Sequence, residues 1–255
     1  MTHNGLLVTR SESVVTLTLH RPPGNRIGLQ TLEALAKAVE DLAQSDARAV
    51  LLMARGSDFS QGSELTDPAL ASETRLDGGR RLAVRGQALI DAWSSLPMPT
   101  VTSVRGWCVG AAAGLVMTAD FRFAANGARV RFPEVDRAVH LGWGLIPRLV
   151  ALCGVAQARW LALGGESRTV ESFRSGVFEL AGDPDGSARR FAQQIALSPP
   201  LAMRTIKASL NAAAEVGQGA AAGDVEAFAQ TVESADFSEA ISAFFERREP
   251  RFKGE

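Results

Sequence analysis

The segment MPTVTSVRGWCVGAAAGLVMTAD, residues 98–120, decides the fold of this chain. Prolines bracket its start, and the apolar residues up to Val104 indicate a short buried strand. Glycines then mark a turn, and the uncharged run from Ala111 indicates a buried helix. Such a turn presents unpaired backbone N–H groups at the helix N-terminus, which suits an anion or the oxyanion of a reacting carbonyl. A plain strand–turn–helix core unit has the same pattern, so the rest of the chain must decide.

The composition indicates a chain that can bury a large core. It has 255 residues, of which 46% are hydrophobic, enough for one domain with an appendage. A net charge of -1 gives no electrostatic case for nucleic-acid binding. The two cysteines form no CxxC motif and the three histidines are scattered, so we expect a reduced protein without a metal site. The N-terminus has no apolar signal core and no apolar run approaches bilayer length, so we expect a cytoplasmic protein that does not enter a membrane.

Strand and helix patterns alternate on both sides of the central segment. The predicted strands are Val14–Leu19, Ala47–Ala54, Phe121–Ala125 and Ala128–Phe132, and the predicted helices include Leu29–Ala43 and Leu82–Leu96. The polar stretch from Thr66 to Arg81 is predicted to be a surface loop. Strands that alternate with helices are typical of an α/β fold with largely parallel pairing.

From Gly186 onward the pattern is helical only. The predicted helices there are Ala188–Ala196, Pro200–Ala214 and Ala220–Phe245. Helices with apolar faces and no strands are typical of an oligomer interface, or of an appendage packed on the core. We therefore divide the chain into a core, residues 1–185, and a C-terminal helical region, residues 186–255.

Further segments, taken in order, carry a family resemblance. They are TLTLHRPPGN (16–25), FSQGSEL (59–65), PTVTSVRGWCVGAAAGL (99–115), FPE (132–134), RLVALCG (148–154), SPPLAMRTIKASLN (198–211) and AFFERREPRFKG (243–254). In their order and spacing they resemble the crotonase (enoyl-CoA hydratase/isomerase) superfamily over essentially the whole chain. The resemblance implies a spiral of strand–strand–helix turns with C-terminal helices that build a homotrimer or hexamer. It also implies an acyl-CoA thioester as substrate, with coenzyme A as part of it and no metal.

The same resemblance implies how the thioester is activated. Two backbone N–H groups would polarise its carbonyl, so that an enolate can form, and they map to Ser63 and Ala111. One donor of this kind is worth roughly 3–4 kcal/mol of barrier. Ala111 stands where the family usually has glycine, so we expect a reshaped oxyanion hole.

The acid–base residues depart from the family pattern. Hydratases of the family usually carry two glutamates, and the matching positions here are Gly114 and Glu134. A single base over an oxyanion hole can move a proton from one carbon to another, which is double-bond isomerisation, and is less well equipped to add water. We therefore predict isomerase-type proton transfer by Glu134. Asp136 and His140 in the same loop are further polar candidates.

Contacts to coenzyme A are also carried over from the family. Backbone groups of Gln61, Ser63 and Leu65 would meet the adenine. Arg26 would lie near the phosphates, which a guanidinium binds through its fork of donors. Lys207 and Lys253 are the C-terminal cations placed to touch the 3′-phosphate, across a subunit boundary.

Alternative functions stay open. Glu134 could activate a water and hydrate an enoyl thioester, or the oxyanion hole could serve decarboxylation or thioester hydrolysis. The chain could also bind acyl-CoA without catalysis, since Gly114 and Ala111 both depart from the family. The dienoyl-CoA isomerase and chlorobenzoyl-CoA dehalogenase branches have an aspartate where this chain has Gly142, so both are disfavoured.

Overall fold

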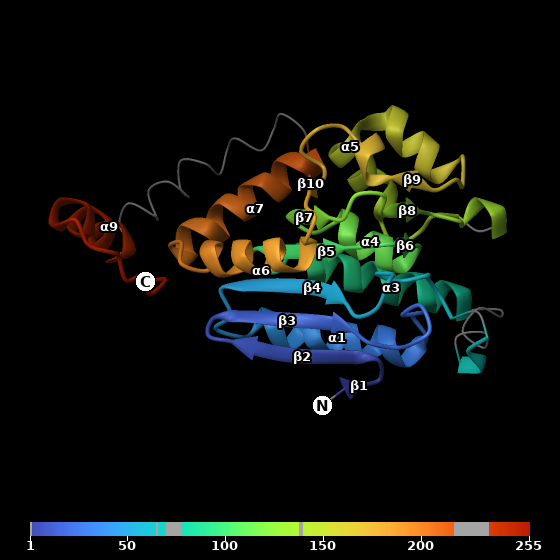
Figure 1. The fold of residues 1–255 in the computed structure, drawn as a ribbon, viewed down its shortest axis with the longest axis horizontal. Helices are drawn as coiled ribbons and strands as arrows, with labels where there is room; N and C mark the ends of the chain where they lie inside the picture. Colours follow the sequence, from blue (N-terminus) through green and yellow to red (C-terminus); the bar gives the residue numbers. More distant parts are fainter. Residues whose placement is uncertain (1, 65, 70–77, 138–139, 217–234) are drawn as a thin grey trace.

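The centre of the computed structural model is a seven-stranded sheet (Figure 1), and the residues described are 2–64, 66–69, 78–137, 140–216 and 235–255. Its strands, in spatial order, are β1 (Thr2–His3), β2 (Leu6–Ser11), β3 (Val14–Leu19), β4 (Ala49–Ala54), β5 (Thr100–Val104), β7 (Phe121–Ala124) and β10 (Glu179–Leu180). β2 pairs antiparallel with β1 and β3, and every pairing from β3 to β10 is parallel. The predicted α/β class is confirmed.

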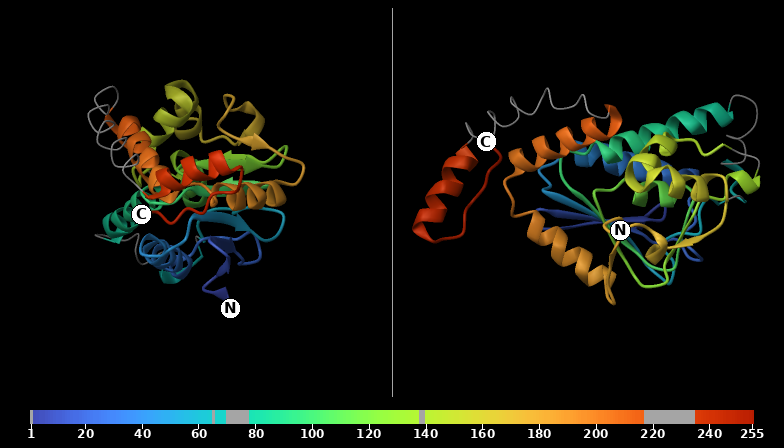
Figure 2. Two further views of the ribbon diagram at one scale, coloured as in Figure 1. Left: turned by 90° about the vertical axis from the view of Figure 1, so that its left-hand side faces the viewer. Right: turned by 90° about the horizontal axis from the view of Figure 1, so that it is seen from above.

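Helices cover both faces of this sheet, as the view from above in Figure 2 shows. The helices are α1 (Leu29–Ala43), α3 (Gly78–Ser94), α4 (Ala111–Met117), α5 (Leu145–Ala162), α6 (Pro184–Ile195), α7 (Pro200–Val216) and α9 (Ala235–Glu246). The larger core joins one sheet face to α1, α3, α4 and α5, and a smaller core joins the other face to α6. Because both faces are covered, every residue of β3, including Thr16 and Thr18, is buried although its sequence alternates.

The central segment contains one strand more than its pattern predicts. After β5, a short strand β6 (Trp107–Val109) leaves the large sheet and pairs with β8 (Arg129–Arg131), which pairs with β9 (Arg168–Thr169). α4 then runs back across the core, with all its residues from Ala112 to Met117 buried. This second sheet carries the turn before α4 beyond the carboxyl ends of the parallel strands, where open α/β sheets usually bind their ligands.

The C-terminal region is helical in the residues described, as predicted. α6 packs on the sheet through Ala188 and Ala192, and α7 contacts α5. In the views of Figures 1 and 2, α9 lies apart from the body, beyond the first turn of α7. Residues 220–234 of the predicted third helix, and residues 70–77 of the predicted loop, lie outside the described residues. The division at residue 185 stays a prediction, and α6 spans it.

α5 is long and apolar enough to cross a membrane, with a mean hydropathy of 1.2 over 18 residues. This differs from the sequence prediction, in which no apolar run approaches the length of a membrane span. The helix is interrupted at Gly154, which has a non-helical backbone with φ 78°. Leu145, Leu149 and Leu161 are buried in the main core, so one side of α5 packs on the core, whereas Val150, Val155 and Trp160 of the same helix are exposed.

Candidate active site

The first candidate oxyanion donor is the N–H of Ser63, in the loop after β4. Ile27 donates its N–H to the Gly62 carbonyl (2.9 Å) and accepts one from the Glu64 N–H (3.0 Å). This pattern is a parallel bridge between Ile27 and Ser63, in which Ser63 directs its own N–H away from Ile27. Gly62, at φ 92°, makes the turn that allows this direction.

The second candidate donor is the N–H of Ala111, the first residue of α4. Gly110 adopts φ 57° and ψ −125°, and its N–H donates to the Arg131 carbonyl at 2.9 Å. The first helical bond runs from the Gly114 N–H to the Gly110 carbonyl (2.9 Å), so the Ala111 N–H precedes the hydrogen-bonded part of the helix. No side chain among the described residues caps this helix. The Ala111 N–H is therefore open to a ligand oxygen.

The two donor turns lie next to each other. Ser60 bridges Cys108, because its N–H donates to the Trp107 carbonyl (2.8 Å) and its carbonyl accepts from the Val109 N–H (3.0 Å). A Cβ added at Gly62 would lie 3.2 Å from a methyl carbon of Val109. This pairing brings the loop after β4 against the strand that leads into α4. The structure thus brings the Ser63 turn and the Ala111 turn together, as an oxyanion hole requires.

Glu134 lies beside the second turn. A Cβ added at Gly110 would lie 3.5 Å from Glu134 Oε1. The Oε2 atom is buried and has no hydrogen-bond partner among the described residues. Burial raises the pKa of the Glu134 carboxyl above its ordinary value, against smaller opposing effects of a backbone hydrogen bond and of Arg137. A carboxylate that is held next to an oxyanion hole, with a raised pKa and a free oxygen, can act as a general base.

One turn further along α4, the volume over Gly114 is filled by apolar side chains. A Cβ added at Gly114 would lie 3.0 and 3.2 Å from the two terminal methyl carbons of Leu145, and 3.5 Å from Cδ1 of Ile90. A side chain at position 114 would therefore have to displace Leu145. Sequence reasoning did not identify Leu145, which comes from the start of α5, far along the chain.

The other two polar candidates of the loop do not join Glu134. Asp136 accepts a hydrogen bond from Arg131 Nη2 at 2.7 Å, and this ion pair is exposed. Arg131 also donates to the Gly165 carbonyl (2.8 Å), which holds the pair on the outer side of the small sheet. His140 is exposed. In the part of the chain that the structure describes, neither residue forms a hydrogen bond or an ion pair with the turn at Gly110, so Glu134 is the acid–base group that the geometry favours.

Two of the predicted coenzyme A contacts flank the Ser63 turn. Arg26 Nη1 lies 3.9 Å from Glu64 Oε1, and its side chain is half-exposed. Gln61 donates its N–H to the Gly24 carbonyl (2.8 Å) and its side-chain amide to Asp58 (2.8 Å). The remaining predicted contact of this loop, Leu65, lies outside the described residues.

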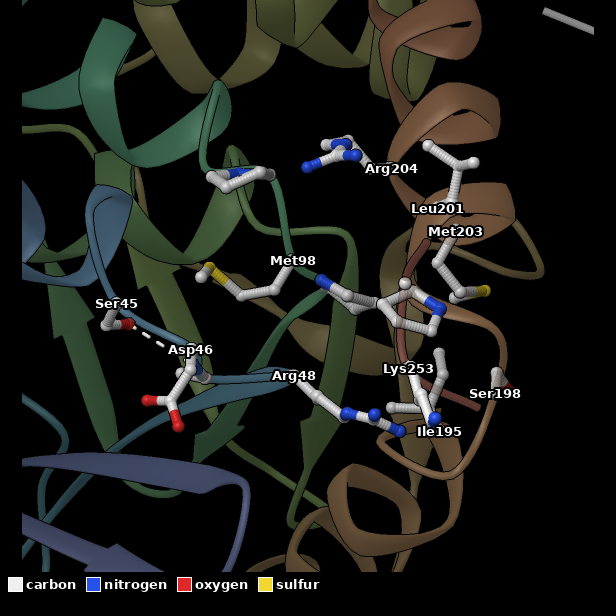
Figure 3. A pocket seen from close by; sticks show the side chains of 15 residues that line it. Ser45, Asp46, Arg48, Met98, Ile195, Ser198, Leu201, Met203, Arg204 and Lys253 are labelled. Carbon is white, nitrogen blue, oxygen red and sulfur yellow. Dashed lines mark hydrogen bonds between the residues drawn. The ribbon is translucent and has the colours of Figure 1, made fainter. Parts of the chain in front are cut away.

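The structure places Lys253 away from these residues. It lines a pocket of about 310 Å³ together with Arg48, Met98, Arg204 and the start of α7 (Figure 3). Arg48 and Met98 precede β4 and β5, so this pocket lies at the amino ends of the parallel strands. The turns of Ser63 and Ala111 follow the carboxyl ends. Within one chain, Lys253 therefore lies at the opposite end of the parallel strands from the turns of Ser63 and Ala111.

Lys207 is buried and hydrogen-bonded within the protein. Its ammonium group donates to Asp120 Oδ2 at 2.7 Å and to the Met98 carbonyl at 3.0 Å. Its side chain is only 9% exposed, and burial lowers its pKa. Lys207 is thus occupied in joining α7 to the ends of the central segment. Among the described residues, no group of three or more His, Cys, Asp and Glu side chains could hold a metal ion.

Comparison with known families shows the family to which the chain belongs. A family model described as enoyl-CoA hydratase/isomerase matches residues 9–255. The chain belongs to this family. The predicted resemblance to the crotonase superfamily is confirmed, and the chain is an acyl-CoA enzyme of the enoyl-CoA hydratase/isomerase type.

Individual family members cover the chain from end to end. A probable enoyl-CoA hydratase of Mycobacterium tuberculosis is 32% identical, over 97% of this chain and 98% of the relative. A methylglutaconyl-CoA hydratase of Rattus norvegicus is 29% identical, over 98% of this chain and 82% of the relative. The crystal structure of an enoyl-CoA hydratase from Bacillus anthracis superposes with a TM-score of 0.90 at 25% identity, over 98% of this chain and 100% of that one. These family members confirm the crotonase fold.

Proposed function

We propose that this protein isomerises the double bond of an enoyl-CoA thioester, with Glu134 as its single acid–base group. The observation that carries the proposal is a partly buried carboxylate with a buried, unpartnered Oε2 at the start of α4, together with the apolar side chains of Leu145 and Ile90 over Gly114, where a second carboxylate would lie. A carboxylate suffices to move a proton between carbons. Hydration needs in addition a water that is held and oriented, and a buried water needs two to four polar partners.

The steps balance without any other reactant. The thioester carbonyl oxygen accepts hydrogen bonds from the N–H groups of Ser63 and Ala111. The Glu134 carboxylate removes a proton from the α carbon of a 3-enoyl thioester, and the electron pair passes through the π system to the carbonyl oxygen. The resulting dienolate is stabilised by the two N–H groups, which contribute roughly 3–4 kcal/mol each. The protonated Glu134 then returns its proton to the γ carbon, which gives the 2-enoyl thioester.

We infer that coenzyme A binds along the Ser63 turn. Backbone groups of Gln61, Ser63 and Leu65 would hold the adenine, and the half-exposed guanidinium of Arg26 supports a phosphate contact beside them. Lys253 would reach the 3′-phosphate only from a neighbouring subunit, since it lies at the other edge of its own sheet. This arrangement requires a homo-oligomer, which we propose to be a trimer or hexamer in the cytoplasm.

A second function, hydration by Glu134 and a water, is favoured by the names of the relatives, since those most similar in sequence are termed hydratases. A third, acyl-CoA binding without catalysis, is motivated by Ala111 and Gly114. Both differ from isomerisation in what they predict for solvent isotopes. Hydration introduces a solvent oxygen into the product, and mere binding introduces neither oxygen nor hydrogen.

The proposal is tested by deuterium exchange at the α and γ carbons of 2- and 3-enoyl-CoA substrates, measured by mass spectrometry. Glu134→Gln should keep CoA-ester binding and lose exchange and double-bond migration by about 10²–10⁴-fold. Asp136→Asn is the matched control, because this carboxylate is close in sequence but is paired with Arg131; its exchange rate should stay at the wild-type value. Wild-type exchange in Glu134→Gln would remove Glu134 from the mechanism.

A further inference from the structure

Two large apolar side chains at the start of α5, Trp143 just before the helix and Leu145 as its first residue, pack against glycines of two other helices. Leu145 lies over Gly114 of α4, with its methyl carbons 3.0 and 3.2 Å from the site of a Cβ. The indole of Trp143 occupies the place that a Cβ at Gly86 of α3 would take. Glycine inside a helix costs about 0.5–1 kcal/mol relative to alanine. At both positions the absence of a side chain on the glycine creates the space that Trp143 or Leu145 fills.

The backbone that carries the two side chains is itself constrained. Trp143 and the following Gly144 both adopt left-handed conformations, with φ 59° and 67°. Such a conformation costs a bulky residue of the order of 1–3 kcal/mol and persists only where surrounding contacts hold it. Here Arg148 donates to the Gly144 carbonyl (3.1 Å) and to Asp91 of α3 (2.8 Å). The segment is therefore held in the one shape that seats both side chains.

Leu145 and the proposed base both lie against the first turn of α4. Gly110, the N-cap residue, and Gly114 are four residues apart, which is about 6 Å along the helix axis. The carboxylate of Glu134 lies at Gly110, and Leu145 lies at Gly114. A carboxylate at position 114, or a water that it held, would have to occupy the volume of Leu145 and Ile90, which offer a water no hydrogen bond.

We propose that Leu145 determines the reaction specificity of this site, by occupying the volume in which a catalytic water and a second carboxylate would lie. Trp143, seated on Gly86, is the positioning residue that holds Leu145 there. This inference rests on the proposed function of Glu134 and adds the residue that limits it to proton transfer. Leu145 takes part in no proton transfer itself.

The test is a set of variants assayed with a 2-enoyl-CoA in H₂¹⁸O. Gly114→Glu alone should fold less stably and hydrate little, because the new side chain meets Leu145. Gly114→Glu with Leu145→Ala should incorporate ¹⁸O about 10²-fold faster than either single variant, the range expected for one added acid–base group. Gly114→Glu with Ile146→Ala is the matched control, since Ile146 is not among the side chains nearest Gly114. It should hydrate no faster than Gly114→Glu.

Two results would overturn the assignment of Leu145. One is a natively folded Gly114→Glu variant that hydrates as fast as the pair with Leu145→Ala. The other is that pair binding CoA esters and melting as wild type, yet incorporating no more ¹⁸O than Gly114→Glu. If the pair does not fold, Leu145→Gln replaces it, because its amide can hold a water in the same volume. It should raise the ratio of hydrated to isomerised product, and a natively folded Leu145→Gln with an unchanged ratio would also refute the proposal.

The role of Trp143 and the proposed isomerisation are tested by separate measurements. Trp143→Ala should raise the same product ratio while leaving the Kd for a CoA ester unchanged; an unchanged ratio would show that Trp143 only supports the fold. If wild type shows no proton exchange but the Gly114→Glu, Leu145→Ala pair hydrates, the proposed isomerisation fails and the role of Leu145 stands. If wild type exchanges protons and the folded pair is inert to water, the reverse holds.

Discussion

At the scale of single residues, burial destabilises the ionised form of the Glu134 side chain, and neighbouring groups only partly offset this effect. One of its oxygens is buried without a hydrogen bond in the described structure, and burial raises its pKa. Polar groups in that condition are rare in folded proteins outside functional sites. The paired and exposed Asp136, two residues on, shows the ordinary state of a carboxylate in the same loop.

The raised pKa predicts how activity depends on pH. The base form of Glu134 is the carboxylate, so kcat/KM for proton exchange should fall as the pH drops through a pKa that lies above the ordinary value of 4.5. The acid limb of the pH profile reports this pKa in the free enzyme. An acid limb at or below the ordinary glutamate value would contradict the burial of Glu134.

The same pKa predicts a stability effect of opposite sense. A carboxyl whose folded pKa is raised destabilises the fold when ionised, so the cost is fully present above the folded pKa and vanishes below the unfolded one. Glu134→Gln should therefore raise Tm at neutral pH, and this gain should shrink as the pH falls through the folded pKa. Thermal unfolding of both proteins over a pH series measures it. A gain independent of pH would have another cause.

At the scale of the elements, the sequence predicts most of the framework. β3 and α1 have the predicted bounds, because VVTLTL and the apolar spacing of residues 29–43 are local patterns. The three-residue β6 is not predicted, since its existence depends on pairing with β8. For the same reason the turns of Ser63 and Ala111 could be named only through the family resemblance.

The apolar contact of Leu145 with Gly114 could not be predicted from local sequence patterns. The contact between Leu145 and Gly114 joins two segments of different helices. From the sequence, Gly114 indicates only that a carboxylate is missing. The one available signal was the pair of glycines at 86 and 114 inside helical patterns, since such glycines usually have a packing reason.

Lys207 gives a prediction at this scale, because it joins α7 to the start of β7. Lys207→Met leaves Asp120 without its ammonium partner in a largely buried position, so it should lower the free energy of unfolding by about 3–5 kcal/mol. Lys37→Met is the matched control: its pair with Asp41 on α1 is exposed, and its loss should cost about 0.5 kcal/mol or less. Urea unfolding measures both, and equal losses would contradict the structural role of Lys207.

At the scale of the whole molecule, the two ends of the sheet carry different parts of the proposed ligand site. The oxyanion turns and Glu134 follow the carboxyl ends of the strands, whereas Lys253 lies in the pocket at their amino ends. α9 lies apart from the body (Figure 1), and its Asp236 accepts a hydrogen bond from the Lys253 N–H at 2.6 Å. In the homo-oligomer that we propose, a complete site would combine residues of two subunits.

This arrangement predicts a KM effect that depends on the 3′-phosphate. Lys253→Gln should raise KM for an enoyl-CoA by about tenfold, the loss expected when a charge-assisted hydrogen bond worth about 1.5 kcal/mol is removed, with kcat unchanged. KM for the matching pantetheine thioester, which has no 3′-phosphate, should not change. Sedimentation should show a trimer or hexamer. A monomer of full activity, or an equal KM change with both substrates, would contradict the shared site.

The measurement that tests the central claim most directly uses the wild-type protein in water labelled with both deuterium and ¹⁸O. An enoyl-CoA thioester is incubated, and the product is analysed by mass spectrometry for both labels. Proton transfer by Glu134 alone predicts a shifted double bond and no ¹⁸O, with deuterium at the α and γ carbons whenever the protonated Glu134 exchanges with solvent before it returns the proton. Incorporation of ¹⁸O at the rate of double-bond migration, or tight binding with neither double-bond migration nor deuterium uptake, would contradict the account.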